Sequence, residues 1–166
     1  LFLALGGSGE IGMNVNLYGC RGKWLMADLG LTFADPDYPG IDLILPDLEF
    51  IEERRDDLVG IVLTHGHEDH IGAIPYLAAD LKVPLYATPF TAGLIAGKLE
   101  EEGLTGQVEL NIIERDGWID LGELAAEQLG KHEGTDVFSV SFSSNDYVGH
   151  DYGPDSPEAH DMSVRT

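Results

Sequence analysis

The feature that most constrains this chain is a run of metal-ligand side chains placed directly behind an apolar segment. Residues His65 to His70 read His-Gly-His-Glu-Asp-His, and they follow Gly60–Thr64, which has the composition of a buried strand. A chain that leaves a buried strand can turn sharply and bring several side chains into one small volume. Imidazole nitrogen and carboxylate oxygen suit zinc and related metals. The run predicts a metal site; the alternative is a polar loop with solvated histidines.

The spacing within this run suggests two coordination positions rather than one. His65 and His67 are offered to a first metal, and Asp69 and His70 face a second. Motifs of this kind are hypotheses whose confirmation depends on their structural context. We therefore expect a strand before the run and a sharp turn within it.

Composition limits the classes of protein to consider. The chain has 166 residues, 43% of them hydrophobic, which suits about one domain with an ordinary core. Its net charge is -21, and residues 1–122 (7 basic, 21 acidic) and 123–166 (2 basic, 9 acidic) are both acidic. This argues against a free-standing nucleic-acid binder with a basic face. It is compatible with an enzyme whose bound metals supply positive charge.

Compartment and membrane association are also constrained. Cys20 is the single cysteine, which excludes an intrachain disulfide and suits a reducing compartment. No stretch reaches the roughly 20 apolar residues of a membrane span. Leu1–Leu5 lacks a basic start and leads into glycines, so we interpret it as a strand and not as a signal peptide. These features predict a cytoplasmic protein without a membrane partner.

Hydrophobic periodicity and turn residues predict alternating strands and helices after a beginning made only of strands. A proline-rich polar loop is expected over 32–47, and the helix that follows it takes Asp47 as its N-cap. The predicted strands cover 1–5, 14–18, 23–28, 60–64, 83–87, 108–114, 118–121 and 136–142, and the predicted helices cover 47–54, 71–81, 89–102 and 123–131. This order favours an α/β layered domain with a mixed sheet.

A glycine pattern near the N-terminus raises a different possibility. Gly7 to Gly12 matches G-x-G-x-x-G behind a strand, as in dinucleotide-binding folds. Such a site needs a helix next, whose N-terminus receives the pyrophosphate. Met13–Tyr18 instead alternates apolar and polar residues and ends in Gly19, which indicates a strand. A tight glycine turn is the preferred interpretation, and a nicotinamide cofactor is the runner-up.

With the ligand run in place, residues 1–122 resemble the metallo-β-lactamase superfamily and, more closely, its ribonuclease J-like β-CASP branch. The resemblance implies a metallo-β-lactamase-type αββα layered fold, of which residues 1–122 correspond to the N-terminal half, followed by a short αβ tail. The segments that carry it are Ala4–Asn14, Lys23–Gly30, Pro39–Asp42, Val62–Leu77 and Tyr86–Thr91.

The same resemblance implies a two-zinc phosphodiesterase that acts on RNA. His65 and His67 would hold one zinc, and Asp69 and His70 the other, with Asp69 placed to orient a bridging hydroxide or accept its proton. Asp69 and His70 are thus the catalytic candidates. Asp28 matches an upstream aspartate that would act behind the ligands; its alternative role is that of a turn residue ending a strand.

Further residues of the proline-rich loop are weaker candidates. Asp35, Asp37 and Tyr38 would flank the mouth of the site, or they belong to a plain solvated loop.

The family pattern is not recognisable beyond residue 122, where a third histidine and a bridging aspartate should follow. Residues 123–166 resemble instead a fragment of the alkaline-phosphatase superfamily, in which Asp146 and His150 would bind one zinc. The alternative is a polar loop over 143–158 without metal. We therefore divide the chain into 1–122 and an unrelated tail, 123–166. Either a fused or misassembled reading frame or an unusual recombination would explain such a chain.

Three functional hypotheses follow. The leading one is a ribonuclease J-like metallo-hydrolase whose activity is impaired by missing ligands. His132, His150 or His160 would replace the third ligand only if the tail folds back over the loop. The second is phosphoester hydrolysis centred on Asp146 and His150. The third is a non-catalytic zinc-binding fragment, with an oligomer or partner chain needed to cover the exposed sheet.

Overall fold

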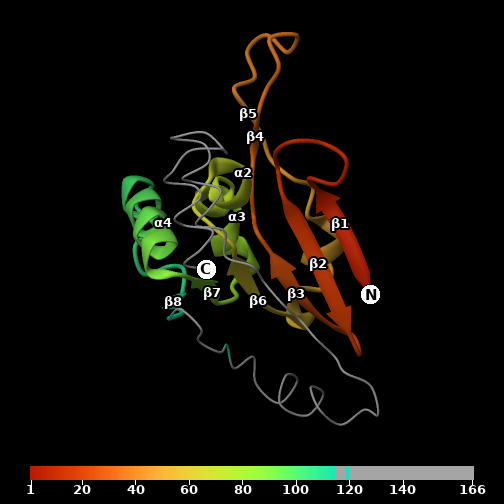
Figure 1. Cartoon of the computed structure of the whole chain (residues 1–166), viewed down its shortest axis with the longest axis vertical. Helices are drawn as coiled ribbons and strands as arrows, with labels where there is room; N and C mark the ends of the chain where they lie inside the picture. Colours follow the sequence, from red (N-terminus) through yellow and green to blue (C-terminus); the bar gives the residue numbers. More distant parts are fainter. Residues whose placement is uncertain (115–118, 120–166) are drawn as a thin grey trace, which may run out of the picture.

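The computed structural model describes residues 1–114 and 119, and a six-stranded mixed sheet organises this part of the chain (Figure 1). The strand order is β1-β2-β3-β6-β7-β8. These strands are β1 (Phe2–Gly6), β2 (Val15–Cys20), β3 (Lys23–Ala27), β6 (Leu58–Leu63), β7 (Leu85–Ala87) and β8 (Leu110–Ile112). The helices are α1 (Glu49–Glu52), a 3-10 turn (Arg55–Asp57), α2 (Glu68–Ile71), α3 (Ile74–Leu81) and α4 (Pro89–Glu101).

The sheet changes character at β3. Strands β1, β2 and β3 pair antiparallel, and β3, β6, β7 and β8 pair parallel. The β2–β3 connection is a two-residue turn in which Arg21 and Gly22 have φ values of 49° and 85°. Two positive φ angles characterise the turn type whose twist matches a hairpin. The mixed sheet expected from the sequence is thereby confirmed.

One face of the sheet forms the hydrophobic core with the helices. Leu17, Met26, Ile61 and Leu85 lie side by side across four neighbouring strands, and each is fully buried. The helical side chains that pack on this face include Ile51, Ile71, Ile74, Leu81, Ile95 and Leu99. A core of this kind fixes the position of each strand end, and therefore of the loops that leave the sheet.

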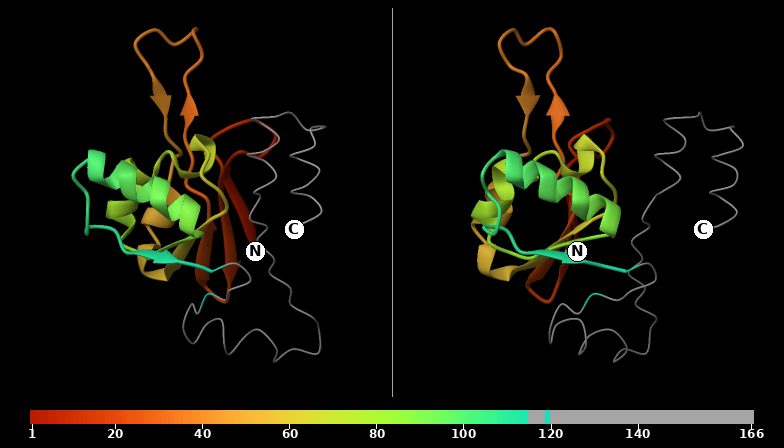
Figure 2. Two further views of the ribbon diagram at one scale, coloured as in Figure 1. Left: turned by 60° about the vertical axis from the view of Figure 1, so that its left-hand side comes forward. Right: turned by 90° about the vertical axis from the view of Figure 1, so that its left-hand side faces the viewer.

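A second, two-stranded ribbon projects from the body of the molecule (Figures 1 and 2). It consists of β4 (Thr32–Phe33) and β5 (Leu43–Ile44), which pair antiparallel. The sequence predicted only a polar loop over 32–47, so this prediction was incomplete. Strands of two residues are too short to show an alternating pattern, and the prolines between them suggested a loop.

Two other predicted elements differ in detail. The helix expected over 71–81 is divided into α2 and α3, and α2 already begins at Glu68. Asp47 is not the N-cap of α1: Leu48 has that position, although the Asp47 Oδ1 atom accepts the backbone N–H of Glu49 at 2.9 Å. The carboxylate therefore satisfies a free helical N–H from one position further out than expected.

Several predictions fall outside the described residues. These are most of the strand at 118–121, the helix at 123–131, the strand at 136–142, the loop at 143–158, and the candidates His132, Asp146, His150 and His160. Within the part of the chain that the structure describes, no helix has the length and apolar character required to cross a membrane.

Gly30 lies where three segments of backbone meet. A Cβ atom added at Gly30 would collide with the carbonyl group of Asp69 and with the backbone nitrogen of Asn14. The N–H of Gly30 donates to the carbonyl of Asn14 at 3.0 Å, and the N–H of Asn14 donates to that of Asp69 at 2.8 Å. Only glycine fits at this crossing without moving α2.

We predict that Gly30→Ala destabilises the protein by about 1–3 kcal/mol, because overpacking forces a backbone shift. Gly93→Ala on the exposed face of α4 is the matched control, since a Cβ there meets nothing within 4 Å. That control should stabilise the protein by roughly 0.5–1 kcal/mol. Urea denaturation of both variants measures the difference. Equal stabilities would contradict the crowding at Gly30.

Candidate active site

The predicted ligand run lies where the carboxyl ends of parallel strands meet. Asp28 follows β3 and Thr64 follows β6, and these two strands are parallel neighbours. Because β2 is antiparallel to β3, the loop between β1 and β2 reaches the same edge of the sheet. In open α/β sheets, this edge is the usual place for a ligand.

The run turns sharply as soon as it leaves β6. His67 has an extended backbone (φ -76°, ψ 153°) and occupies the N-cap position of α2 without a side-chain cap bond, so His65 and His67 precede the helix. Asp69 and His70 lie within its first turn. The ring centroids of His65 and His67 are 4.6 Å apart, and those of His65 and His70 are 4.0 Å apart. The strand and the sharp turn expected from the sequence are both present, and the imidazoles lie together.

Asp28 connects the ends of β3 and β6 from beneath the histidines. Its Oδ1 atom accepts the backbone N–H of Thr64 at 2.8 Å, and its Oδ2 atom lies 2.8 Å from the Nδ1 atom of His70. An ionised carboxylate only accepts hydrogen bonds, so the hydrogen of the second bond belongs to Nδ1. In this tautomer the lone pair lies on Nε2, which accepts the Nδ2–H of Asn14 at 3.2 Å. Contacts of this type orient metal-binding histidines.

The backbone of Asp28 is as unusual as its contacts. Asp28 is 5% exposed and has a φ of 64°, in the left-handed region. Aspartate and asparagine tolerate this region better than most residues because their short side chains bond locally. Both alternatives considered for Asp28 therefore describe it in part: it ends a strand in a turn, and it also contacts a candidate ligand.

Asn14 contacts the same group of residues from the opposite side, and the sequence did not single it out as a site residue. Its Nδ2 atom lies 3.1 Å from the Oδ2 atom of Asp69 and 3.2 Å from the Nε2 atom of His70. The amide therefore holds the two side chains together, and their Oδ2 and Nε2 atoms are 3.4 Å apart. The sequence signal was present, since Asn14 directly follows the glycine turn of the β1–β2 loop.

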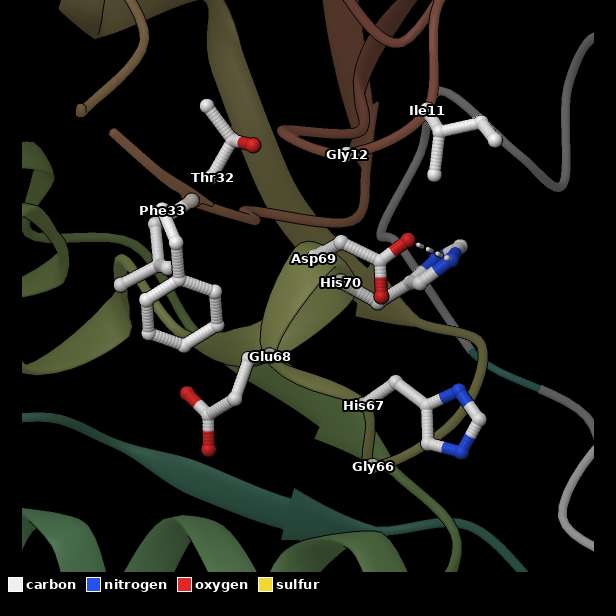
Figure 3. Close-up of a pocket in the computed structure, with 10 residues that line it drawn as sticks. Ile11, Gly12, Thr32, Phe33, Gly66, His67, Glu68, Asp69 and His70 are labelled. Atoms are coloured by element: carbon white, nitrogen blue, oxygen red, sulfur yellow. Dashed lines mark ion pairs between the residues drawn. The ribbon is translucent and has the colours of Figure 1, made fainter. Parts of the chain in front are cut away.

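A pocket of about 700 Å³ opens beside these residues (Figure 3). One side is formed by residues 66–70, which include His67, Asp69 and His70. Residues of the β1–β2 loop and of the segment around β4 form the other side. They are Ile11, Gly12, Leu31, Thr32 and Phe33. Figure 3 shows Asp69 and His70 close together, with Glu68 directed away from them.

Glu68, which lines the pocket but has no role among the candidate metal ligands, pairs with Lys98 of α4. The Nζ atom of Lys98 donates to Oε1 of Glu68 at 2.6 Å. Because the Glu68 carboxylate is paired with Lys98, it does not join the candidate metal ligands Asp69 and His70. The ion pair connects α4 to the turn that carries the site.

The weaker candidates from the proline-rich loop lie outside the pocket lining. Asp35, Asp37 and Tyr38 lie in the turn between β4 and β5, where the backbone N–H of Tyr38 donates to the carbonyl of Asp35 at 2.9 Å. They do not line the described pocket.

Within residues 1–114 and 119, no three His, Cys, Asp or Glu side chains are arranged to hold one metal ion. The described residues thus offer pairs of donors and not a complete ligand set.

The glycine pattern Gly7–Gly12 does not lead into a helix. Gly7, Gly9 and Gly12 have positive φ angles, and β2 follows the loop. The glycines serve a tight turn, as preferred from the sequence, and the helix that a dinucleotide site requires is not present there.

Comparison with known proteins decides the family. A sequence profile of the metallo-β-lactamase superfamily matches residues 14–149. The chain belongs to the metallo-β-lactamase superfamily. The predicted α/β fold of this superfamily is therefore confirmed.

The chain is similar in sequence to ribonuclease J proteins. The Sinorhizobium meliloti protein is 44% identical over 134 residues, which cover 78% of this chain and 24% of the relative. The Thermus thermophilus protein is 37% identical over 155 residues, covering 89% and 25%. The predicted resemblance to ribonuclease J is confirmed, and the chain spans about a quarter of the length of these relatives.

Among solved structures, the short form of human tRNase Z is 14% identical. The match covers 69% of this chain and 46% of that protein, with a TM-score of 0.44.

The match to the metallo-β-lactamase sequence profile runs past residue 122 and includes Asp146. The resemblance of the tail to the alkaline-phosphatase superfamily gains no support from these matches, and the division at residue 122 stays a prediction.

We predict that Asp28→Ala lowers the free energy of unfolding of the metal-free protein by about 1–3 kcal/mol, because it leaves the Thr64 N–H without its acceptor. Asp28→Asn retains one acceptor oxygen and a residue that tolerates a positive φ, so its loss should be smaller. Denaturant titrations in the presence of a chelator measure both. Equal losses for the two variants would contradict the role assigned to the Asp28 oxygen.

Proposed function

We propose that this chain carries the metal-binding half of a ribonuclease J-like hydrolase that cleaves phosphodiester bonds in RNA. The observation that carries the proposal is the convergence of His65, His67, Asp69 and His70 at one edge of the sheet. Similarity to ribonuclease J supports the choice of RNA as substrate. On this proposal, the protein acts in the cytoplasm.

The donors of the site fit zinc in their chemical type. Three imidazoles and one carboxylate are the ligands that zinc takes in hydrolases. The Nε2 atom of His65 is buried, and that of His70 is directed to Asp69 by the bond between Nδ1 and Asp28. We assign His65 and His67 to one zinc and Asp69 and His70 to a second. Bound zinc would lower the pKa of a coordinated water and stabilise negative charge on the phosphate.

The residues of the chain have distinct roles in this proposal. Asn14 holds the Asp69 carboxylate through the 3.1 Å bond to Oδ2, which leaves Oδ1 to orient or deprotonate a water. Asp28 keeps His70 in one tautomer and one orientation. Asp28 and Asn14 thus act as positioning residues for the two groups that we assign to catalysis.

The strength of metal binding is part of the proposal. A catalytic zinc site usually has three protein ligands, whereas our assignment gives each position two, and no three donor side chains among the described residues are arranged to hold one metal ion. We therefore expect the 166-residue chain to bind zinc more weakly than a complete site, and to hydrolyse RNA slowly. A further ligand would come from residues of this chain outside the described part, from a second copy of the chain or from a partner protein.

The direct test is the double variant His65→Ala/His67→Ala. We expect it to lose about half of the bound zinc or more, because both proposed ligands of one position are removed. Elemental analysis after dialysis against limiting zinc measures the content. Glu101→Ala at the end of α4 is the control, since this exposed carboxylate is not part of the site. Unchanged zinc in the double variant would remove the basis of the assignment.

Activity is tested with a labelled single-stranded RNA under single-turnover conditions. We expect zinc-dependent cleavage by the unmodified chain, abolished by a chelator and restored by added zinc. Asp69→Asn should reduce the rate by about 100-fold or more, because general acid–base catalysis contributes 10²–10⁴-fold. Cleavage that persists in the chelator would contradict a metal-dependent hydrolase.

A further inference from the structure

The pocket has two chemically different walls, and the proposed function uses only one of them. Residues 66–70 supply the polar wall with the proposed metal donors. The opposite wall presents two large apolar side chains, Ile11 of the β1–β2 loop and Phe33 of β4. In Figure 3, Ile11 and Phe33 flank Asp69 and His70 on two sides of the pocket.

These two side chains are exposed although other residues of the same two segments, Gly12 and Leu31, are buried. Phe33 is 65% exposed and Ile11 is 97% exposed, whereas Leu31 is 3% exposed. Single exposed apolar residues are common on protein surfaces and need no explanation. Two of them in one concave site, beside polar donors, match the composition of a ligand pocket, which combines apolar walls with a few polar groups.

The apolar wall is held in place by backbone contacts. Phe33 pairs with Leu43 in the ribbon, and the N–H of Ala34 donates to the carbonyl of Asp42 at 3.1 Å. A Cβ atom added at Gly12 would touch the side chain of Thr32, so the β1–β2 loop packs directly against β4. The ring of Phe33 therefore starts from a fixed backbone position, which reduces the entropy lost when a ligand binds.

The charges around this wall select what can bind there. None of the described residues that line the pocket is a lysine or an arginine, and Lys98 is paired with Glu68. Asp35, Asp37 and Asp42 lie further out along the ribbon and would repel phosphate groups. The wall thus suits an uncharged, flat group that lies close to the metal donors.

We propose that Phe33 forms a stacking surface for one base of single-stranded RNA, with Ile11 as an apolar contact on the other side of the pocket. This inference rests on the proposed function, and it adds the part of the substrate that the wall recognises. Single-stranded nucleic acids bind through stacking of bases on aromatic side chains, largely without regard to sequence. The base next to the cleaved bond would contact Phe33, while its phosphate faces His67 and Asp69.

The test compares variants and probes in pairs. The probes are a fluorescein-labelled oligouridylate with phosphorothioate linkages, which slow hydrolysis, and the same oligonucleotide without bases. The variants of the zinc-loaded chain are Phe33→Ala, Phe33→Trp and Phe2→Ala. Phe2 is the matched control because it is 60% exposed at the start of β1, at the opposite edge of the sheet. Fluorescence anisotropy gives each dissociation constant.

We expect Phe33→Ala to weaken binding of the oligouridylate by about tenfold, within the range measured for one stacked base. It should leave binding of the base-free oligonucleotide unchanged. Phe33→Trp should retain or improve the affinity, which also shows that changes at this position leave the site folded. Phe2→Ala should bind both probes as the unmodified chain does.

The contrary outcomes separate the inference from the proposed function. If the unmodified chain binds and cleaves RNA while Phe33→Ala binds equally well, the stacking surface is wrong and the proposed function stands. If Phe33→Ala weakens both probes equally, Phe33 acts on the shape of the site and the inference is overturned. If the unmodified chain neither binds nor cleaves RNA, the proposed function fails and the inference fails with it.

Discussion

The Asp28 carboxylate is the contact on which the arrangement of the site depends. It connects the end of β3 to the end of β6 through the Thr64 N–H, and it connects both to His70 through Nδ1. A buried carboxylate is costly unless its oxygens are bonded, so these contacts must form together for Asp28 to remain buried. The position of His70 is therefore set by the sheet and not by the loop alone.

Backbone hydrogen bonds extend this coupling to the β1–β2 loop. The N–H groups of Asn14, Leu29 and Leu31 donate to the carbonyls of Asp69, His70 and Glu68 at 2.8 to 3.1 Å. Two segments that are far from α2 in sequence, one at Asn14 and one at Leu29–Leu31, thus fix the first turn of α2. A four-residue helix has little stability of its own, so these tertiary contacts are what make α2 a rigid platform for Asp69 and His70.

The parts of this arrangement that depend on local sequence were predictable, and those that depend on distant contacts were not. The apolar run before His65 identified β6, and alternation identified β2. Asn14 was missed as a site residue because its contact with Asp69 spans 55 residues. The ribbon of β4 and β5 was missed because its strands are too short to carry a period. Family resemblance supplied the role of Asp28, which its position at the end of a strand left open.

The acidity of the chain constrains how it would hold RNA. Most nucleic-acid binders gain affinity from lysine and arginine contacts to phosphates, which makes their binding strongly dependent on salt. With a net charge of -21, this chain has few such contacts to offer. On the proposed function, bound metal ions attract the phosphate of the RNA. The remaining affinity must come from an uncharged contact with the base. An aromatic side chain beside the metal donors meets that requirement, because stacking does not depend on charge.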